Sequence, residues 1–105
     1  MNQDFDTDEE GFLEDPGQWT EVFARRAARD EGIELTDKHW ELIYQARVFY
    51  ETYGFSPSMR PLVKFVGMNL GPDKGRSIYL MKHFPPSPAR LLSRLAGLHK
   101  PKNCL

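Results

Sequence analysis

Hydrophobic residues recur every three to four positions through most of the chain, which is the spacing of one face of an α-helix. Asp15 followed by Pro16 is typical of a helix start, and Gly32 ends this first pattern. Thr36 can cap a second, longer helix that runs to Gly54 and carries a wide apolar stripe, which predicts a central helix. The aromatic residues of this stripe are interpreted as core rather than as a cofactor-binding cluster.

Three shorter helices are predicted in the second half of the chain. They cover residues 56–71, after a serine- and proline-rich start, residues 73–84, stopped by a proline pair, and residues 87–97, with Gly97 as the C-cap. The side chains expected to face the core from all five helices are Trp19, Val22, Phe23, Ala27, Trp40, Ile43, Tyr44, Ala46, Val48, Phe49, Tyr50, Tyr53, Leu62, Val63, Phe65, Val66, Met68, Ile78, Tyr79, Leu80, Met81, Leu91, Leu92 and Leu95.

The N-terminal segment lacks this helical spacing. A turn at Glu10 and Gly11 predicts a short strand or β-hairpin that carries Phe12 and Leu13 inward. With 105 residues, of which 40% are hydrophobic, the chain can bury one modest core. We therefore expect a single domain over residues 1–105.

Composition excludes several classes of protein. No apolar run approaches the length that crosses a bilayer, so no membrane partner is expected. The first ten residues are acidic and polar, the reverse of a secretory signal. The single cysteine, Cys104, cannot form an internal disulfide or a multi-cysteine zinc site. We expect a cytoplasmic protein, where thiols stay reduced.

Charge is divided unevenly between the two halves of the chain. Residues 1–55 hold 14 Asp or Glu and 5 Lys or Arg, whereas residues 56–105 hold 9 Lys or Arg and one acid, Asp73. This division favours a basic face for an acidic partner or nucleic acid, and the alternative is that the halves neutralise each other across the fold. The candidate docking residues are Arg60, Lys64, Lys74, Arg76, Lys100 and Lys102.

Other motifs give little chemistry. Residues 71–77 have only three residues between their glycines, so we interpret them as a turn rather than a phosphate-binding loop. The third and fourth helices could form a helix-turn-helix that contacts DNA. His39, His83 and His99 share no metal-ligand spacing, and no complete hydrolytic site is visible. No metal and no cofactor are expected.

The C-terminal tail is the strongest functional candidate. Gly97 ends the last helix and Pro101 prevents a return to helix, so these two residues are the predicted hinge of an arm, residues 98–105. Fully extended, these eight residues reach at most ~26–29 Å. Lys100 and Lys102 should favour the thiolate of Cys104, the nucleophilic form. The tail is interpreted as a swinging arm whose reactive tip enters other proteins.

This tail resembles the C-terminal arm of the DsrC/TusE sulfur-carrier family, whose members end in a penultimate cysteine. The likeness extends through nearly the whole chain, at Gly11-Phe12-Leu13, Trp19, Gly32-Ile33, Leu35, His39-Trp40, Phe49-Tyr50, Ser56-Pro57, Arg60, Leu62-Val63-Lys64, Lys74-Gly75, Tyr79-Leu80, Phe84-Pro85, Pro88-Ala89, Gly97-Leu98, Lys100-Pro101 and Cys104-Leu105. The resemblance implies a mainly α (α+β) fold: about five helices in an orthogonal bundle, a small N-terminal β-hairpin and a flexible C-terminal arm.

The resemblance also implies a function. Cys104 would accept sulfane sulfur as a persulfide and pass it on, which makes the protein a sulfurtransferase in the sense of a carrier. In the TusE branch the donor is a multi-subunit sulfur-relay complex, and the acceptor is the enzyme that makes the 2-thiouridine of the tRNA wobble base. In the DsrC branch the carrier serves dissimilatory sulfite reductase and uses a second cysteine eleven residues upstream of the last.

Ser93 occupies that upstream position here, so the sulfite-reductase cycle is disfavoured. Two smaller departures are Ile78, where the family pattern leads us to expect Arg, and a short stretch before Phe5. The leading hypothesis is a persulfide carrier for tRNA thiolation. The alternatives are a carrier in dissimilatory sulfur metabolism and a helix-turn-helix regulator of sulfur genes that uses Cys104 as a sensor.

Overall fold

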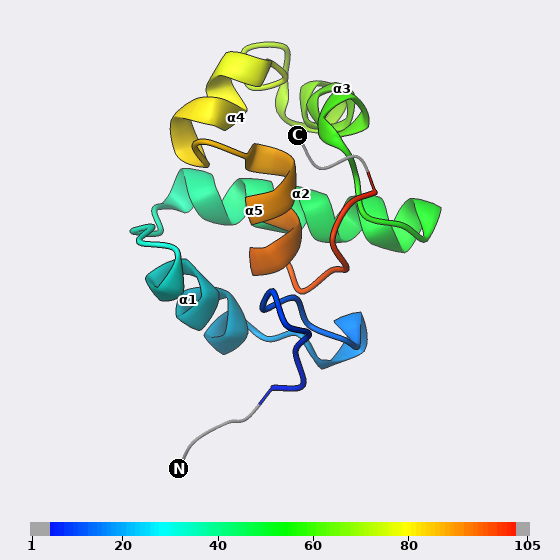
Figure 1. The fold of residues 1–105 in the computed structure, drawn as a ribbon. Helices are drawn as coiled ribbons and strands as arrows, with labels where there is room; N and C mark the ends of the chain where they lie inside the picture. The colour runs from blue at the N-terminus through cyan, green and yellow to red at the C-terminus, as the bar shows by residue number, and fades with distance from the viewer. Residues whose placement is uncertain (1–4, 103–105) are drawn as a thin grey trace.

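The computed structural model describes residues 5–102, which form a mainly helical domain (Figure 1). Within this range the helices are η1 (Pro16–Gln18), α1 (Glu21–Asp30), α2 (Asp37–Tyr53), α3 (Met59–Leu70), α4 (Ser77–His83) and α5 (Pro88–Leu95). The predicted number of α-helices is therefore confirmed for this part of the chain. No helix among the described residues is long and apolar enough to cross a membrane.

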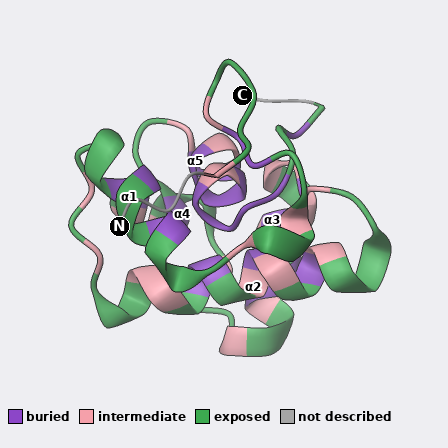
Figure 2. Ribbon diagram, turned by 90° about the horizontal axis from the view of Figure 1, so that it is seen from below, coloured by how far each residue is buried: buried purple, intermediate pink, exposed green. Residues whose placement is uncertain are grey.

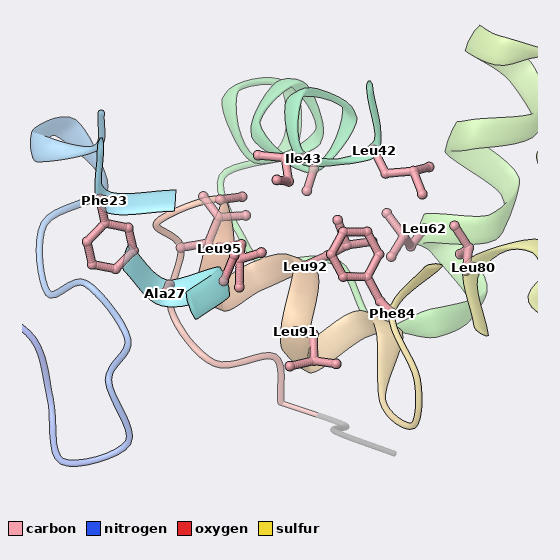
Figure 3. Packing of buried hydrophobic residues seen from close by; sticks show 14 of the residues in the cluster. Phe23, Ala27, Leu42, Ile43, Leu62, Leu80, Phe84, Leu91, Leu92 and Leu95 are labelled. Atoms are coloured by element: carbon pink, nitrogen blue, oxygen red, sulfur yellow. The ribbon is translucent and has the colours of Figure 1, made fainter. Parts of the chain in front are cut away.

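The central helix is α5 rather than the predicted α2. This short helix contacts each of the other four α-helices, and it crosses in front of α2 in Figure 1. Its leucines Leu91, Leu92 and Leu95 are buried among side chains from α1, α2, α3 and α4 (Figure 3). The wide apolar stripe of α2 had predicted that α2 is the central helix, but much of that stripe lies at the surface.

Seven side chains expected in the core are in fact substantially exposed. A helix shows only part of its circumference to its neighbours, and a small domain cannot cover every apolar residue. The exposed residues are Val22, Tyr44, Val48, Tyr53, Met68, Ile78 and Met81.

The first predicted helix is divided in two. Asp15 and Pro16 start only the 3-10 turn η1, because the backbone of Trp19 is extended. A new start follows at Thr20, whose Oγ1 accepts a hydrogen bond from the backbone N–H of Phe23 at 3.3 Å. Because the backbone of Trp19 is extended, its side chain reaches the C-terminal end of α5 and bonds to Leu95.

Helix α4 begins at Ser77, four residues later than predicted, because residues 73–76 form a turn against α3. A Cβ on Gly75 would lie 2.3 Å from the Cα of Gly67, so the two backbones are in direct contact. The local pattern did not reveal this close approach.

The predicted N-terminal β-hairpin is wrong for the described residues, which contain no strand. Residues 5–14 form a loop closed by one antiparallel bridge between Thr7 and Leu13. The side chain of Asp8 takes the place of backbone acceptors that a regular pair of strands would use, because its Oδ1 accepts hydrogen bonds from the N–H groups of Glu10 and Phe12. The expected inward position of Phe12 and Leu13 is confirmed, since both are fully buried.

Candidate functional site at the base of the C-terminal arm

The proposed reactive residue, Cys104, lies outside the described residues, so the site is built from the segment that leads to it. This segment, residues 97–102, is called the arm base. It connects the end of α5 to the last described residue, Lys102.

The arm leaves α5 at a fixed point. Gly97 has a φ of +74°, and a Cβ there would lie 2.4 Å from Cδ1 of Trp19. The indole Nε1–H of Trp19 donates to the carbonyl oxygen of Leu95 at 2.8 Å, and Arg47 donates to the carbonyl oxygen of Ala96 at 2.8 Å. The Arg47 guanidinium also lies 4.3 Å from the centre of the Trp19 ring. These contacts give hydrogen-bond donors to carbonyl groups that the end of the helix leaves without a partner, and they set the direction of the chain.

The first residues of the predicted arm pack against the body. Leu98 is fully buried, and its N–H donates to the carbonyl oxygen of Ser93 at 2.9 Å. The hydroxyl of Ser56 donates to the carbonyl oxygen of His99 at 2.6 Å, while His99 Nε2 is 2.9 Å from the carbonyl oxygen of Glu14. Pro101 is buried as well. Within the described part of the chain, the proposed arm is therefore anchored from Gly97 to Pro101 and does not leave the body at Leu98.

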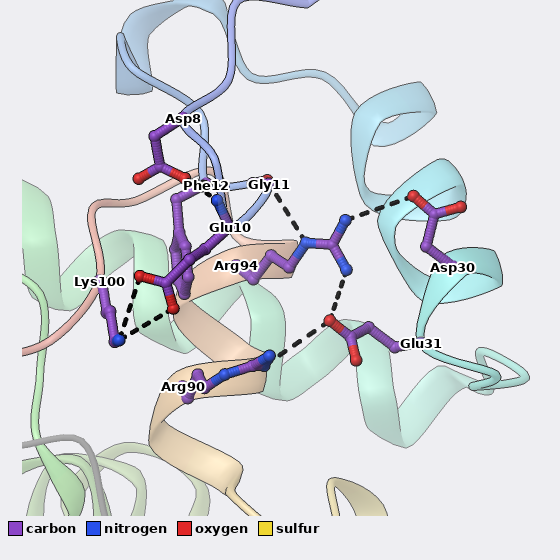
Figure 4. A network of polar contacts seen from close by, with 9 residues as sticks. All are labelled: Asp8, Glu10, Gly11, Phe12, Asp30, Glu31, Arg90, Arg94 and Lys100. Carbon is purple, nitrogen blue, oxygen red and sulfur yellow. Dashed lines mark hydrogen bonds and ion pairs between the residues drawn. The ribbon is translucent and has the colours of Figure 1, made fainter.

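An ion pair adds to this anchoring. Lys100 Nζ lies 2.9 Å from Oε2 of Glu10, and Figure 4 shows this pair beside the N-terminal loop. The sequence suggested that Lys100 would act on the thiol, and the structure gives it a carboxylate partner in the body.

A cleft of about 560 Å³ lies beside the arm base. Its walls come from the α2–α3 connection, through Phe55, Ser56 and Ser58, and from the arm base itself, through Pro101 and Lys102. The last described residue of the chain thus borders an open cleft, which leaves room for a partner near the thiol-bearing end.

The candidate docking residues on α3 and around the start of α4 differ in their surroundings. Lys74 is 2.8 Å from Glu41, and this hydrogen bond raises the pKa of Lys74. Arg60 and Lys64 are exposed on α3, and Arg76 is exposed at the start of α4.

A second charged network holds the N-terminal loop against α5 (Figure 4). Arg94, whose side chain is only 12% exposed, pairs with Glu31 and Asp30 and donates to the carbonyl oxygen of Gly11. Arg90 lies 3.6 Å from Glu31. This network fixes Gly11 and the neighbouring Glu10, which in turn holds Lys100.

The three histidine side chains make hydrogen bonds within the fold. His39 Nδ1 accepts from the backbone N–H of Thr36 at 3.1 Å, so its Nε2–H donates to the carbonyl oxygen of His83 at 2.9 Å. Burial lowers the pKa of His39 below its ordinary value of 6.5. Among the described residues there is no group of three metal-binding side chains.

Ser93, at the position of the upstream cysteine of the DsrC pattern, is fully buried in α5, and its hydroxyl has no hydrogen-bond partner in the described structure. Its side chain is therefore not a reactive group at the surface.

Sequence reasoning named Trp19 and Ser56 but did not predict that they hold the arm base together with Glu10 and Arg47. Trp19 bonds to a residue 76 positions away, and Lys100 bonds to one 90 positions away. No local pattern signals such contacts.

The described residues form a small helical body that anchors the base of the C-terminal tail, and the sequence of that tail carries the single cysteine. A family model described as DsrC like protein matches residues 1–105, and the chain belongs to this family. The resemblance seen in the sequence is thereby confirmed.

Named relatives and solved structures agree with this assignment. The chain is 51% identical over 100 residues to the sulfurtransferase TusE homolog of Haemophilus influenzae, covering 95% of this chain and 92% of that protein. It is 42% identical over 100 residues to sulfurtransferase TusE of Yersinia pseudotuberculosis, covering 95% and 93%. The NMR structure of Allochromatium vinosum DsrC matches with a TM-score of 0.87 and 42% identity, over 96% of this chain and 90% of that one. The oxidized gamma-subunit of the dissimilatory sulfite reductase (DsrC) from Archaeoglobus fulgidus matches with a TM-score of 0.80 and 39% identity, over 96% and 92%.

Proposed function

We propose that this protein is a sulfur-relay carrier that accepts sulfane sulfur on Cys104. The Cys104 thiolate attacks the outer sulfur of a donor persulfide, so a new sulfur–sulfur bond forms at Cys104 while the bond in the donor breaks. The donor leaves as a thiolate, and no external oxidant or reductant is needed. Cys104 then presents the outer sulfur to an acceptor.

The observation that carries this proposal is the identity of 42–51% with sulfurtransferases over nearly the whole chain, combined with a single cysteine that follows the anchored arm base. A carrier needs no catalytic pocket of its own, because both partners bring their own chemistry. The cleft beside Lys102 is consistent with a thiol that works at an interface.

We propose the tRNA 2-thiouridylase as the acceptor and a multi-subunit sulfur-relay complex as the donor, both in the cytoplasm. The relatives named TusE support this branch. The exposed cations Arg60, Lys64, Arg76 and Lys102 are the proposed docking residues, and Lys74 and Lys100 contribute less because carboxylates of the body engage them.

A carrier for dissimilatory sulfite reductase is the second candidate function. The structural match to the gamma-subunit of that enzyme from Archaeoglobus fulgidus favours it. Ser93 argues against it, since this chain has no second thiol to close a disulfide with Cys104. The named relatives are sulfurtransferases and sulfite reductase subunits, which favours a carrier over a DNA-binding regulator.

Reconstitution tests the proposed branch. The relay complex, this carrier, the thiouridylase and unmodified tRNA are combined with a cysteine desulfurase and cysteine, and 2-thiouridine is measured by mass spectrometry. We expect thiolation with the wild-type carrier and only background with Cys104→Ser. Equal thiolation with both carriers would exclude this function.

A further inference from the structure

A groove of about 380 Å³ lies between the C-terminal end of α2 and the outer face of α3. Figure 2 shows that the last turn of α2 and the connection after it are exposed. The groove is lined mainly by apolar side chains, among them the aromatic residues Phe49, Tyr53, Phe55 and Phe65.

The aromatic side chains hold the groove in a preformed shape. Phe49 is the buried floor at 4% exposure, and its ring centre lies 4.7 Å from that of Tyr53, 5.5 Å from Phe55 and 5.3 Å from Phe65. The rim is open, since Tyr53, Phe55 and Met68 are 52%, 55% and 69% exposed. Exposed apolar side chains gathered around one hollow are typical of an interaction site.

The α3 side of the groove carries one lining cation, Lys64, and Arg60 lies one turn before it on the same helix. Arg60, Lys64 and Met68 are spaced four residues apart on α3, so they lie along one ridge of that helix. Arg60 and Lys64 are exposed and form no ion pair within residues 5–102. By contrast, Lys74 pairs with Glu41 across the fold. The ridge is therefore complementary to carboxylates of a partner.

The groove lies beside the cleft at the arm base. Phe55 lines both hollows, and Lys102, the last described residue, lines the cleft. A partner seated in the groove would thus lie next to the point from which the chain continues to Cys104.

We propose that this groove is the docking site for the protein that exchanges sulfur with Cys104, and that it receives an apolar side chain of a partner segment flanked by carboxylates. The proposal rests on the proposed function and adds the surface that holds the partner. A protein segment fits better than nucleic acid, because the rings pack against one another, several edge to face, and the rim holds few cations.

Binding measurements with matched variants test the groove. The probes are the purified relay complex and the purified thiouridylase, each titrated against Met68→Glu and Lys64→Glu, and free tRNA is titrated separately against the same variants. The matched controls lie at exposed positions of α4 that do not line the groove. Ile78→Glu, like Met68→Glu, replaces an exposed apolar side chain by a carboxylate, and Lys82→Glu reverses the charge of a lysine as Lys64→Glu does. We expect both groove variants to lose about tenfold or more in affinity for at least one probe, while the controls stay within about twofold.

Two outcomes would overturn the proposal. One is wild-type affinity of both groove variants for both probes. The other is a loss confined to binding of tRNA alone, which would make the groove a nucleic-acid surface. Lys64 is exposed, so Lys64→Glu keeps the test valid if Met68→Glu alters folding.

Direct loading of Cys104 with sodium polysulfide, a small sulfur donor, distinguishes a failure of partner docking from a failure of the proposed sulfur-carrier function. The groove variants should form the Cys104 persulfide at the wild-type rate, because the groove does not supply the nucleophile. If Cys104→Ser still relays sulfur, the proposed function fails whatever the groove variants do.

Discussion

Two glycines with nearly the same φ allow the contact that directs the arm base to be tested separately from backbone strain. Gly97 and Gly32 have φ values of +74° and +73°, but only at Gly97 would a Cβ meet another side chain, Trp19. Both alanine variants lose about 1–2 kcal/mol to the left-handed backbone. We expect Gly97→Ala to lose a further ~1–3 kcal/mol by overpacking, as measured by urea unfolding. Equal losses would show that Trp19 does not hold the chain at this point.

His39 gives stability a pH dependence. Burial lowers its pKa, and the neighbouring His83 lowers it further, although the bond to the His83 carbonyl acts in the opposite direction. The unfolded chain therefore binds a proton at higher pH than the folded chain does. The contribution of His39 is present above the ordinary pKa of 6.5 and is lost as pH falls below it.

Thermal melts of His39→Gln check this expectation. Glutamine can accept from Thr36 and donate to His83 without titrating. We expect the melting temperature of the wild type to fall more than that of His39→Gln between about pH 7.5 and pH 5.5. Equal falls in the melting temperatures of the two proteins would show that His39 does not cause the pH dependence of stability.

At the scale of elements, the arm base belongs to the fold. Leu98 is buried with the core, whereas Lys102 is exposed. A chain that ends at Pro101 should keep its melting temperature within a few degrees of wild type. A chain that ends at Gly97 loses the burial of Leu98, worth about 2–3 kcal/mol, and should melt roughly 10 °C lower or more. Similar melting of both truncated chains would contradict the anchored base.

The sequence predicted those parts of the fold that depend on neighbours in the chain. Thr36 and Gly54 bound α2 as expected, and the number of α-helices was correct for the described residues. The split at Trp19, the central position of α5 and the aromatic groove were missed, because each depends on contacts between distant segments. For the same reason, Cys104 could be singled out as the only thiol, but the anchoring of the residues before it could not be predicted.

At the scale of the whole molecule, the acidic first half and the basic second half of the chain meet in ion pairs within the fold. Five of the ion pairs among the described residues join an acid of residues 1–55 to a cation of residues 56–105. The halves therefore neutralise each other in part, as the alternative interpretation expected. The cations left over include Lys64, which lines the groove, and Arg60, which lies one turn before it on α3.

The anchored base also shortens the expected reach of the thiol. Cys104 follows Pro101 by three residues, a span of at most about 11 Å, compared with ~23–25 Å if the arm were free from Gly97. Deleting Lys102 and Asn103 would remove about 7 Å of that span. We expect alkylation of Cys104 by a small reagent to persist and protein-to-protein sulfur transfer to fall at least about tenfold.

The matched control for this deletion is the double variant Lys102→Ala, Asn103→Ala, which removes the same side chains and keeps the length. It should transfer sulfur much faster than the deletion. Equal rates in the two variants would mean that the side chains, rather than the reach, determine transfer.

The central claim is that Cys104 carries the sulfur. The most direct measurement incubates the wild type and Cys104→Ser with the relay complex, a cysteine desulfurase and isotopically labelled cysteine, and then determines the masses of their C-terminal peptides under non-reducing conditions. The account predicts a gain of one labelled sulfur atom on the wild-type peptide, lost on reduction, and no gain on the variant. A labelled variant peptide, or an unlabelled wild-type peptide while the desulfurase is active, would contradict it.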